Sequence, residues 1–187
     1  MKPEILTHPH IPKPLHGMNP RTILGKNWWD KTRFEAQART NYTCSACGVH
    51  KSKAKKHKWL EGHEYWNIDY STGRCEVVSI EPLCHYCHNF IHSGRLSMIM
   101  GEEKSKQEVF DILSHGFEIL SNNNLNAFYL TYKMAVTLGV NTFAVQPDKF
   151  IIKGKEADWK DYVLILDGKG YKSKFKSEKE WFNHYNK

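Results

Sequence analysis

Four cysteines in two short pairs are the residues of this 187-residue sequence with the clearest capacity for chemistry. Cys44 and Cys47 form one C-x-x-C pair, Cys84 and Cys87 form a second, and 36 residues separate the two pairs. Each pair can wrap around one side of a zinc ion, which favours thiolate ligands in a tetrahedral arrangement. The spacing therefore predicts a structural four-thiolate zinc site rather than disulfides.

A Cys₂His₂ finger, formed by the first cysteine pair with His88 and His92, is the alternative ligand set. Its loop would be far longer than the roughly twelve residues usual in such fingers. It would also leave the second cysteine pair without a role, so we favour the four-thiolate set. The fifth cysteine, Cys75, is predicted to be a small buried residue.

Histidine and carboxylate side chains beside the cysteines suggest a second metal. With four sulfurs on the zinc, His88 and His92 are left one turn apart on the same face of a predicted helix. His63 and Glu64 lie in a predicted strand upstream. A hairpin packed against that helix would bring the four side chains around one point, and such a donor set suits a catalytic divalent ion.

The elements that must position these residues give an α+β pattern. We expect an extended arm over residues 1–20, a helix over 28–39, and a β-hairpin from strands over 58–69 and 75–80 that Pro82 terminates. A helix then begins near the second cysteine pair. The predicted segments are an N-terminal arm and helix (1–41), a zinc-bound finger (42–100) and a C-terminal α/β region (101–187).

Periodicity in the C-terminal region predicts a helical hairpin followed by a β-hairpin and a helix. Apolar stripes indicate helices over residues 105–120 and 125–138. The D-G-K-G sequence at 167–170 is a strong turn signal between two predicted strands. Ser177, with Glu180 three residues later, has the pattern of a helix N-cap.

The whole chain has a formal net charge of +7, and the positive charge is concentrated in its first half. Residues 1–100 carry 14 Lys/Arg against 8 Asp/Glu, and residues 101–187 carry 13 against 12. This asymmetry predicts nucleic acid as the partner rather than a membrane, although a merely solvated lysine loop is the alternative. The candidate phosphate-binding residues are Lys51, Lys53, Lys55, Lys56, Lys58, Arg74 and Arg95. We see no signal peptide and no membrane span, and expect an intracellular protein.

The combined motifs are similar to a known family. Cys44-x-x-Cys47-Gly, then L-E-G-H-E at 60–64 and L-C-H-Y-C-H-N-F-I-H at 83–92, resemble the zinc-ribbon branch of the HNH endonucleases, which are common in bacteria and their phages. The resemblance covers residues 42–96. It implies a ββα-metal finger, a structural zinc, a catalytic Mg²⁺, Mn²⁺ or other divalent ion, cleavage of double-stranded DNA, and a cytoplasmic location in a bacterial or phage-infected cell.

The resemblance also implies catalytic roles for His63, Glu64, Ser79 and His88, and places His63, Glu64, His88 and His92 at the divalent ion. Two assignments are open: either His63 is the general base and Glu64 a ligand, or His63 is a ligand and Glu64 occupies the base position. We favour His63 as base, because imidazole titrates near neutral pH.

One position departs from the family pattern. Ser79 stands where the family has the asparagine that orients the base, so this role falls to the serine or to Asn67, Asp69 or Asn89. The departure leaves a second interpretation, a catalytically inactive zinc module that binds DNA or a protein. Residues 101–187 are then the candidate surface for a protein partner.

Overall fold

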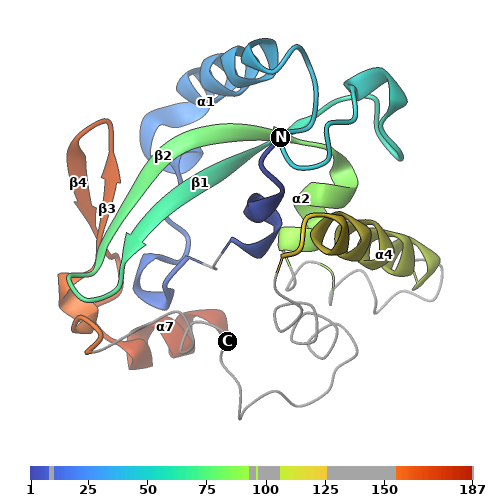
Figure 1. Cartoon of the computed structure of the whole chain (residues 1–187). Coiled ribbons are helices and arrows are strands. Elements are labelled where there is room, and N and C mark those ends of the chain that lie inside the picture. The colour runs from blue at the N-terminus through green and yellow to red at the C-terminus, as the bar shows by residue number, and fades with distance from the viewer. Residues whose placement is uncertain (9–10, 93–95, 97–105, 126–154, 187) are drawn as a thin grey trace. The chain divides into compact units, whose positions relative to one another are not determined.

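The computed structural model describes residues 1–8, 11–92, 96, 106–125 and 155–186. Its described elements are a four-stranded sheet and four α-helices, an α+β architecture (Figure 1). The predicted helix over 125–138 lies, apart from its first residue, outside the described residues. Within the described part of the chain, no helix combines the length and the apolar character that crossing a bilayer requires.

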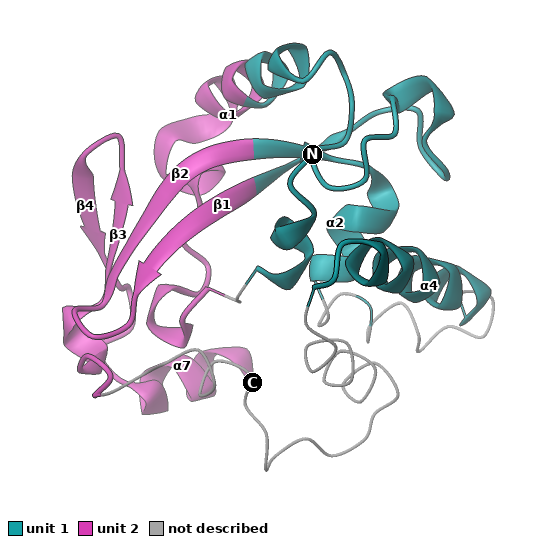
Figure 2. Ribbon diagram, in the orientation of Figure 1, with its two compact units in different colours: residues 1–8, 33–63, 81–147 teal, residues 9–32, 64–80, 148–187 magenta. Residues whose placement is uncertain are grey.

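The chain divides into two compact units, each assembled from distant stretches of sequence (Figure 2). One unit comprises residues 1–8, 33–63 and 81–147, and we call it the cysteine unit. The other comprises residues 9–32, 64–80 and 148–187, and we call it the hairpin unit. Each unit thus takes residues from all three segments that the sequence suggested.

The sheet has the strand order β1-β2-β3-β4. Strands β1 (Glu61–Asp69) and β2 (Arg74–Leu83) are joined by a turn over residues 70–73, and β3 (Val163–Leu166) and β4 (Lys169–Lys172) form an antiparallel pair. Strand β3 also pairs in parallel with the start of β2, where Cys75 is opposite Leu164. This parallel pairing joins segments that are far apart in sequence, and periodicity gave no sign of it.

Pro82 does not end the second strand, as the sequence suggested, but lies inside β2. Proline lacks the N–H that a central strand needs for its ladder. Strand β3, however, pairs only with residues 74–76 of β2, far from the proline. The Pro82 carbonyl meanwhile accepts a hydrogen bond of 2.8 Å from the Ser45 N–H, so this end of β2 is used to hold the first cysteine loop.

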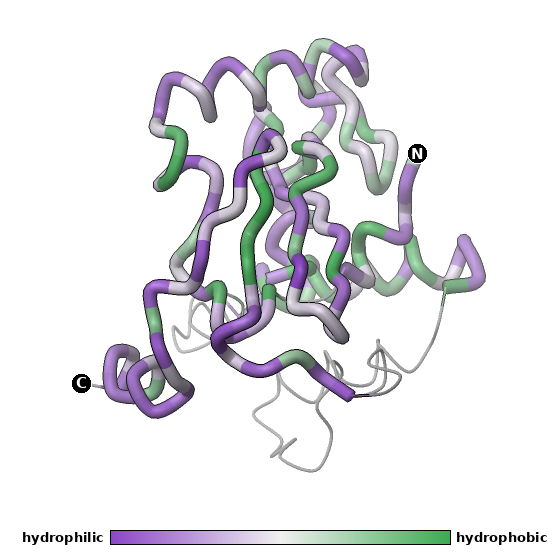
Figure 3. Tube along the Cα trace, turned by 90° about the vertical axis from the view of Figure 1, so that its left-hand side faces the viewer, coloured by the Kyte–Doolittle hydropathy of each residue, from purple (hydrophilic) through white to green (hydrophobic). Residues whose placement is uncertain are grey.

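The hairpin unit has an apolar core around β3. Cys75 is fully buried there, as predicted, together with Leu15, Tyr162, Leu164 and Leu166. Burial raises the pKa of the Cys75 thiol to about 12, so it is protonated and inert near neutral pH. Figure 3 shows hydrophobic residues in short runs between hydrophilic ones, which agrees with a mean hydropathy of −0.62.

The turn and cap that the sequence predicted near the C-terminus are confirmed. Asp167 and Gly168 both have positive φ, 47° and 75°, as the tight turn between β3 and β4 requires. Helix α7 (Glu178–Tyr185) begins after Ser177, whose hydroxyl accepts a hydrogen bond from the Glu180 N–H. The Glu180 carboxylate in turn accepts one from the N–H of Lys176, the residue before the N-cap. The short turn η5 (Trp159–Asp161) precedes β3.

The first twenty residues are not simply an extended arm. They contain two 3₁₀ turns, η1 (Pro3–Thr7) and η2 (Lys13–Leu15). Ile5, Leu6 and Leu15 are fully buried, so the segment contributes to the cores of the units. Helix α1 (Pro20–Arg39) is longer than the predicted 28–39, with a break at Gly25, whose φ of 87° is not helical.

Helices α2 (His85–Ile91) and α4 (Lys106–Asn122) pack against each other in the cysteine unit (Figure 1). The predicted apolar stripe of α4 is partly confirmed: Val109, Ile112 and Leu120 are buried, whereas Phe110 is exposed. Gly116 is the point of closest approach, because a Cβ atom there would overlap the ring of Phe90 on α2. A residue without a side chain is therefore required at this crossing.

We expect Gly116→Ala to destabilise the protein. Alanine would normally favour a helix interior by about 1 kcal/mol. Overlap with Phe90 should outweigh that gain, for a net loss of about 1–3 kcal/mol in the free energy of unfolding measured with denaturant. Ser114→Ala, at an exposed position of the same helix, is the control and should change stability by less than about 0.5 kcal/mol. A stabilised Gly116→Ala protein would contradict this packing.

Candidate metal centre

The first cysteine pair lies on a tight loop that follows α1. Residues 43 and 50 form an isolated antiparallel bridge that closes the loop. Inside it, the Cys44 N–H donates to the Val49 carbonyl and the Gly48 N–H donates to the Cys44 carbonyl, both at 2.9 Å. Gly48 has a φ of 72°, which a residue with a side chain adopts only with strain. The loop thereby turns both thiols to the same side.

The second cysteine pair lies where β2 gives way to α2. Cys84 is the N-cap of the helix and Cys87 falls in its first turn. The His88 N–H donates to the Cys84 carbonyl at 2.9 Å, so the helical hydrogen bonds begin at the cysteine itself. Residues three apart in a first helical turn lie on one face, and this spacing again turns two thiols to one side.

The predicted four cysteines come together in the cysteine unit. The Sγ atoms of Cys44, Cys47, Cys84 and Cys87 all lie within 4.8 Å of one another. Two sulfurs that share a tetrahedral zinc at bonds of about 2.3 Å are about 3.8 Å apart, and the Cys47 and Cys84 sulfurs are separated by 3.8 Å. The donor set and its spacing fit a structural metal such as zinc. The alternative Cys₂His₂ set is not formed, because the two histidines belong to a different group.

Crowding of four thiols makes their ionisation mutually dependent. Hydrogen bonds from the other three thiols lower the pKa of Cys44. Contact with Cys44 and Cys47 raises the pKa of Cys84 and of Cys87. A thiolate at Cys44 is therefore stabilised by its neighbours, and it opposes ionisation of Cys84 and Cys87. A divalent cation removes that conflict, since it accepts all four as thiolates.

His115 of α4 adds a contact that the sequence did not reveal. Its Nε2 lies 3.4 Å from the Cys87 sulfur and 4.0 Å from the Cys84 sulfur. An imidazole N–H directed at a metal-bound thiolate offsets part of the negative charge that four such ligands bring. The packing of α4 on α2 places it there, so only tertiary structure could identify the residue.

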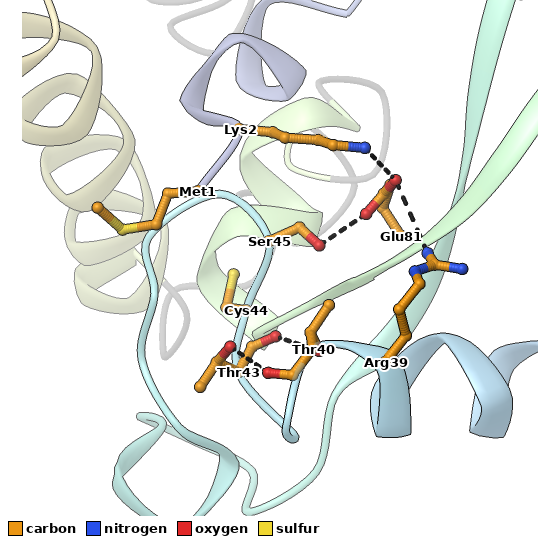
Figure 4. Close-up of a pocket in the computed structure, with 8 residues that line it drawn as sticks. All are labelled: Met1, Lys2, Arg39, Thr40, Thr43, Cys44, Ser45 and Glu81. Atoms are coloured by element: carbon orange, nitrogen blue, oxygen red, sulfur yellow. Dashed lines mark hydrogen bonds and ion pairs between the residues drawn. The ribbon is translucent and has the colours of Figure 1, made fainter.

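A buried carboxylate fastens the first cysteine loop to β2 (Figure 4). The Glu81 side chain is 3% exposed, accepts a hydrogen bond from the Ser45 hydroxyl and pairs with Lys2 at 2.7 Å each, and lies 3.9 Å from Arg39. The Lys2 N–H donates to the Ser45 carbonyl as well. These residues line a pocket beside Cys44 (Figure 4). The clamp holds one cysteine loop against the strand that leads to the other.

Three of the predicted second-metal residues also converge. His63 of β1, His88 of α2 and His92, the C-cap of α2, place ligand nitrogens within 4.8 Å of one another. The Nε2 atoms of His88 and His92 are 3.1 Å apart. Two imidazole nitrogens on one ion, with bonds of about 2.0–2.1 Å and angles of about 90–110°, are separated by about 2.8–3.4 Å. The histidine triad, as we call these three residues, therefore has the spacing of a metal site.

Glu61 orients one imidazole of this triad. Its Oε2 lies 2.7 Å from Nδ1 of His88, and its Oε1 lies 3.0 Å from Nδ1 of His85. Burial alone would raise the pKa of Glu61, but hydrogen bonds and the charge of His85 and His88 outweigh it and hold this pKa well below its usual range. An ionised Glu61 keeps the proton of His88 on Nδ1, which leaves Nε2 as the ligand atom.

The other predicted catalytic residues are not part of the triad. Glu64 and Ser79 are half-buried residues of β1 and β2 and belong to the hairpin unit, as do Asn67 and Asp69. Their catalytic roles stay predictions. Asn89 is fully buried in α2, where its Nδ2 donates to the His85 carbonyl at 2.8 Å.

The predicted phosphate-binding residues differ in their surroundings. Lys51 and Lys53 form the turn η3 (Lys51–Lys53), and Lys53, Lys55 and Lys58 are exposed. Lys56 is ion-paired with Glu108 at 2.6 Å, and Arg74 with Glu76 at 3.1 Å. Arg95 lies outside the described residues.

No protein-family model, curated protein or solved structure matches the chain. The geometry of its own residues therefore carries the functional argument.

We expect Cys84→Ser to abolish binding of the structural metal. Removal of one of four thiolates opens the tetrahedral site, and metal binding to such loops is coupled to their folding. Mass spectrometry under native conditions should show loss of one zinc per chain, and cooperative unfolding of the cysteine unit should weaken or vanish. Cys75→Ser removes a thiol from the other unit and should leave the zinc count unchanged. Stoichiometric zinc in the Cys84 variant would refute the assignment.

Removal of the Glu81 carboxylate should destabilise the protein. Glu81→Ala leaves the Ser45 hydroxyl and two cations without their shared acceptor, so we expect a loss of about 2–3 kcal/mol in the free energy of unfolding. Glu76→Ala, on the same strand, breaks an exposed pair with Arg74 and should cost less than about 0.5 kcal/mol. Equal effects of the two substitutions in denaturant titrations would show that burial of Glu81 contributes nothing to the free energy of unfolding.

Proposed function

We propose that the chain is a metal-dependent nuclease of the HNH type that hydrolyses phosphodiester bonds in DNA. The convergence of His63, His88 and His92 beside a four-cysteine cluster is the observation that carries this proposal. Structural metal and hydrolytic metal then have separate donor sets. A four-sulfur set is closed, whereas three imidazoles leave coordination positions open for water and a phosphate oxygen.

The donor set favours a particular kind of ion. Imidazole nitrogens suit Zn²⁺, Ni²⁺ or Co²⁺, and Mn²⁺ accepts them less readily, whereas Mg²⁺ prefers oxygen ligands and gives up its water reluctantly. When bound, such an ion would polarise the scissile phosphate and stabilise charge on the leaving oxygen. The chain's own contribution is to hold three imidazoles with the tautomer that binds, as Glu61 does for His88.

The triad favours the assignment in which His63 is a metal ligand rather than the general base. His63 is 3% exposed, and its ring lies 5.5 Å from that of His88 and 5.1 Å from that of His92. A side chain buried among two candidate ligands suits a ligand better than a base that must reach solvent. We therefore assign His63 to the metal and assign no general base, because the next residue of β1, Glu64, points to the opposite face of the strand.

The exposed lysines near this site suit the phosphate backbone of the substrate. Lys53, Lys55 and Lys58 are exposed on the loop between the first cysteine pair and β1, and the Lys58 ammonium donates to the Ala54 carbonyl at 2.8 Å. Contacts of this kind add affinity without reading base sequence, and they weaken with salt. Lys56 contributes less in this proposal, since Glu108 neutralises it.

A plasmid-nicking assay with full-length protein tests the proposal. We expect cleavage with Mn²⁺, Co²⁺ or Ni²⁺ to exceed cleavage with Mg²⁺. His88→Ala and His92→Ala should each lower the rate about 100-fold or more. His50→Ala, in the same unit but outside the triad, is the control.

Two outcomes would contradict the proposal. Cleavage that survives in both helix variants would place the chemistry elsewhere. Salt-sensitive DNA binding with no cleavage under any of these ions would instead identify a zinc module that binds nucleic acid without hydrolysis.

A further inference from the structure

We propose that His57, Glu61 and His85 form a second site for a divalent transition-metal ion, distinct from the histidine triad and from the four cysteines. One nitrogen or oxygen from each of these residues lies within 4.8 Å of the others. All three belong to the cysteine unit. The site does not depend on the proposed nuclease activity, because none of its histidines belongs to the triad.

The hydrogen bonds of His85 leave one ring nitrogen directed at Glu61. Its Nε2 lies 3.1 Å from Oε1 of Glu108, and its Nδ1 lies 3.0 Å from Oε1 of Glu61. The Nδ2 atom of Asn89 also lies 3.2 Å from Nδ1 and 3.3 Å from Nε2 of this ring. A cation between Nδ1 and the Glu61 oxygen would take the place of the proton that a hydrogen bond puts there.

The spacing suits a cation. A nitrogen and an oxygen on one ion, at bonds of about 2.0–2.2 Å and angles of about 90–110°, are separated by about 2.8–3.6 Å. The 3.0 Å between His85 and Glu61 falls in this range. Glu108 would then be the partner that orients the ligand ring, a common arrangement for metal-bound histidine.

Neighbouring side chains hold the third ligand in place. The ring of His57 stacks on Trp59, with centroids 4.0 Å apart and an angle of 10° between planes. It meets the ring of His85 edge to face at 4.6 Å. Lys56 pairs with the other oxygen of Glu108 at 2.6 Å, which fixes the carboxylate behind His85. Binding would therefore cost little side-chain entropy.

The chemistry of the donors identifies the class of ligand. Two imidazoles and one carboxylate suit Zn²⁺, Co²⁺, Ni²⁺ or Cu²⁺ and are too few in oxygen for Ca²⁺ or Mg²⁺. Three protein ligands also leave positions for water, so the ion should exchange more readily than one held by four thiolates. The two oxygens of Glu61 serve different sites: Oε1 faces His85, and Oε2 orients His88 of the triad.

Titration of full-length protein with Co²⁺ or Ni²⁺ tests this inference, with the structural zinc retained. Native mass spectrometry and calorimetry give the number of ions bound beyond zinc and their affinities. His57→Phe preserves a flat ring against Trp59 but removes the ligand nitrogens. We expect this variant to bind one ion fewer than the wild type, or to bind it at least about tenfold more weakly.

Two matched variants locate the effect. His92→Ala removes a ligand of the triad and should leave the site at His57 intact. His50→Ala removes a loop histidine that belongs to neither group, so it should bind as many ions as the wild type. Unchanged ion number and affinity in His57→Phe would overturn the inference and identify the cluster as a hydrogen-bonded network of His85 between two carboxylates. If His50→Ala lost as many bound ions as His57→Phe, the inference would also be overturned, because surface histidines in general would then bind the ions.

Discussion

Convergence of four thiols is the interaction on which the rest of the cysteine unit depends. The two pairs approach from different directions, one on a loop after α1 and one at the junction of β2 with α2. Four sulfurs within 4.8 Å of one another cannot all ionise unless a cation balances them, and cannot all be neutral and bind an ion. An ion that satisfies this constraint fixes α2 against the loop. The residues carried by α2 and by the following α4 are then fixed as well.

Charge balance also governs two carboxylates, the buried Glu81 and the half-buried Glu61. Glu81 is balanced by Lys2 and, more distantly, by Arg39, which come from the chain terminus and the end of α1. Glu61 is balanced by imidazoles of α2. Burial of a carboxylate is unfavourable unless charge and hydrogen bonds compensate it. Each carboxylate therefore selects one arrangement of the segments around it, the first at the cysteine loop and the second at the start of β1.

The sequence predicted local features well and tertiary partnerships poorly. The two C-x-x-C pairs, the four-residue spacing of His88 and His92, the turn at Asp167 and the cap at Ser177 each reflect a rule that acts over a few residues. The parallel pairing of β3 with β2 and the position of Pro82 inside β2 depend on segments distant in sequence, and periodicity carries no signal for them.

The candidate site shows the same division between local and tertiary signals. Glu61 lies in the L-E-G-H-E motif, yet only the packing of β1 on α2 shows that its carboxylate joins His85 and His88. His115 and His57 belong to no motif. His115 reaches the cysteines because α4 packs on α2, and His57 is held in place because its ring stacks on that of Trp59. Spacing and motif therefore found the four cysteines and the histidine triad, whereas the residues that orient them and the group of His57, Glu61 and His85 required the fold.

Helix α2 shows how one short element separates two kinds of donor. At about 100° per residue, His85, His88 and His92 fall within about 60° of one another around the axis, whereas Cys87 lies about 100° beyond His88. Sulfur thus faces the first cysteine loop and nitrogen faces the start of β1, although Cys87 and His88 are adjacent in sequence. Soft thiolates and borderline imidazoles prefer different partners. Their separation on α2 allows a structural metal to be held by sulfur alone, with the imidazole nitrogens grouped apart from it.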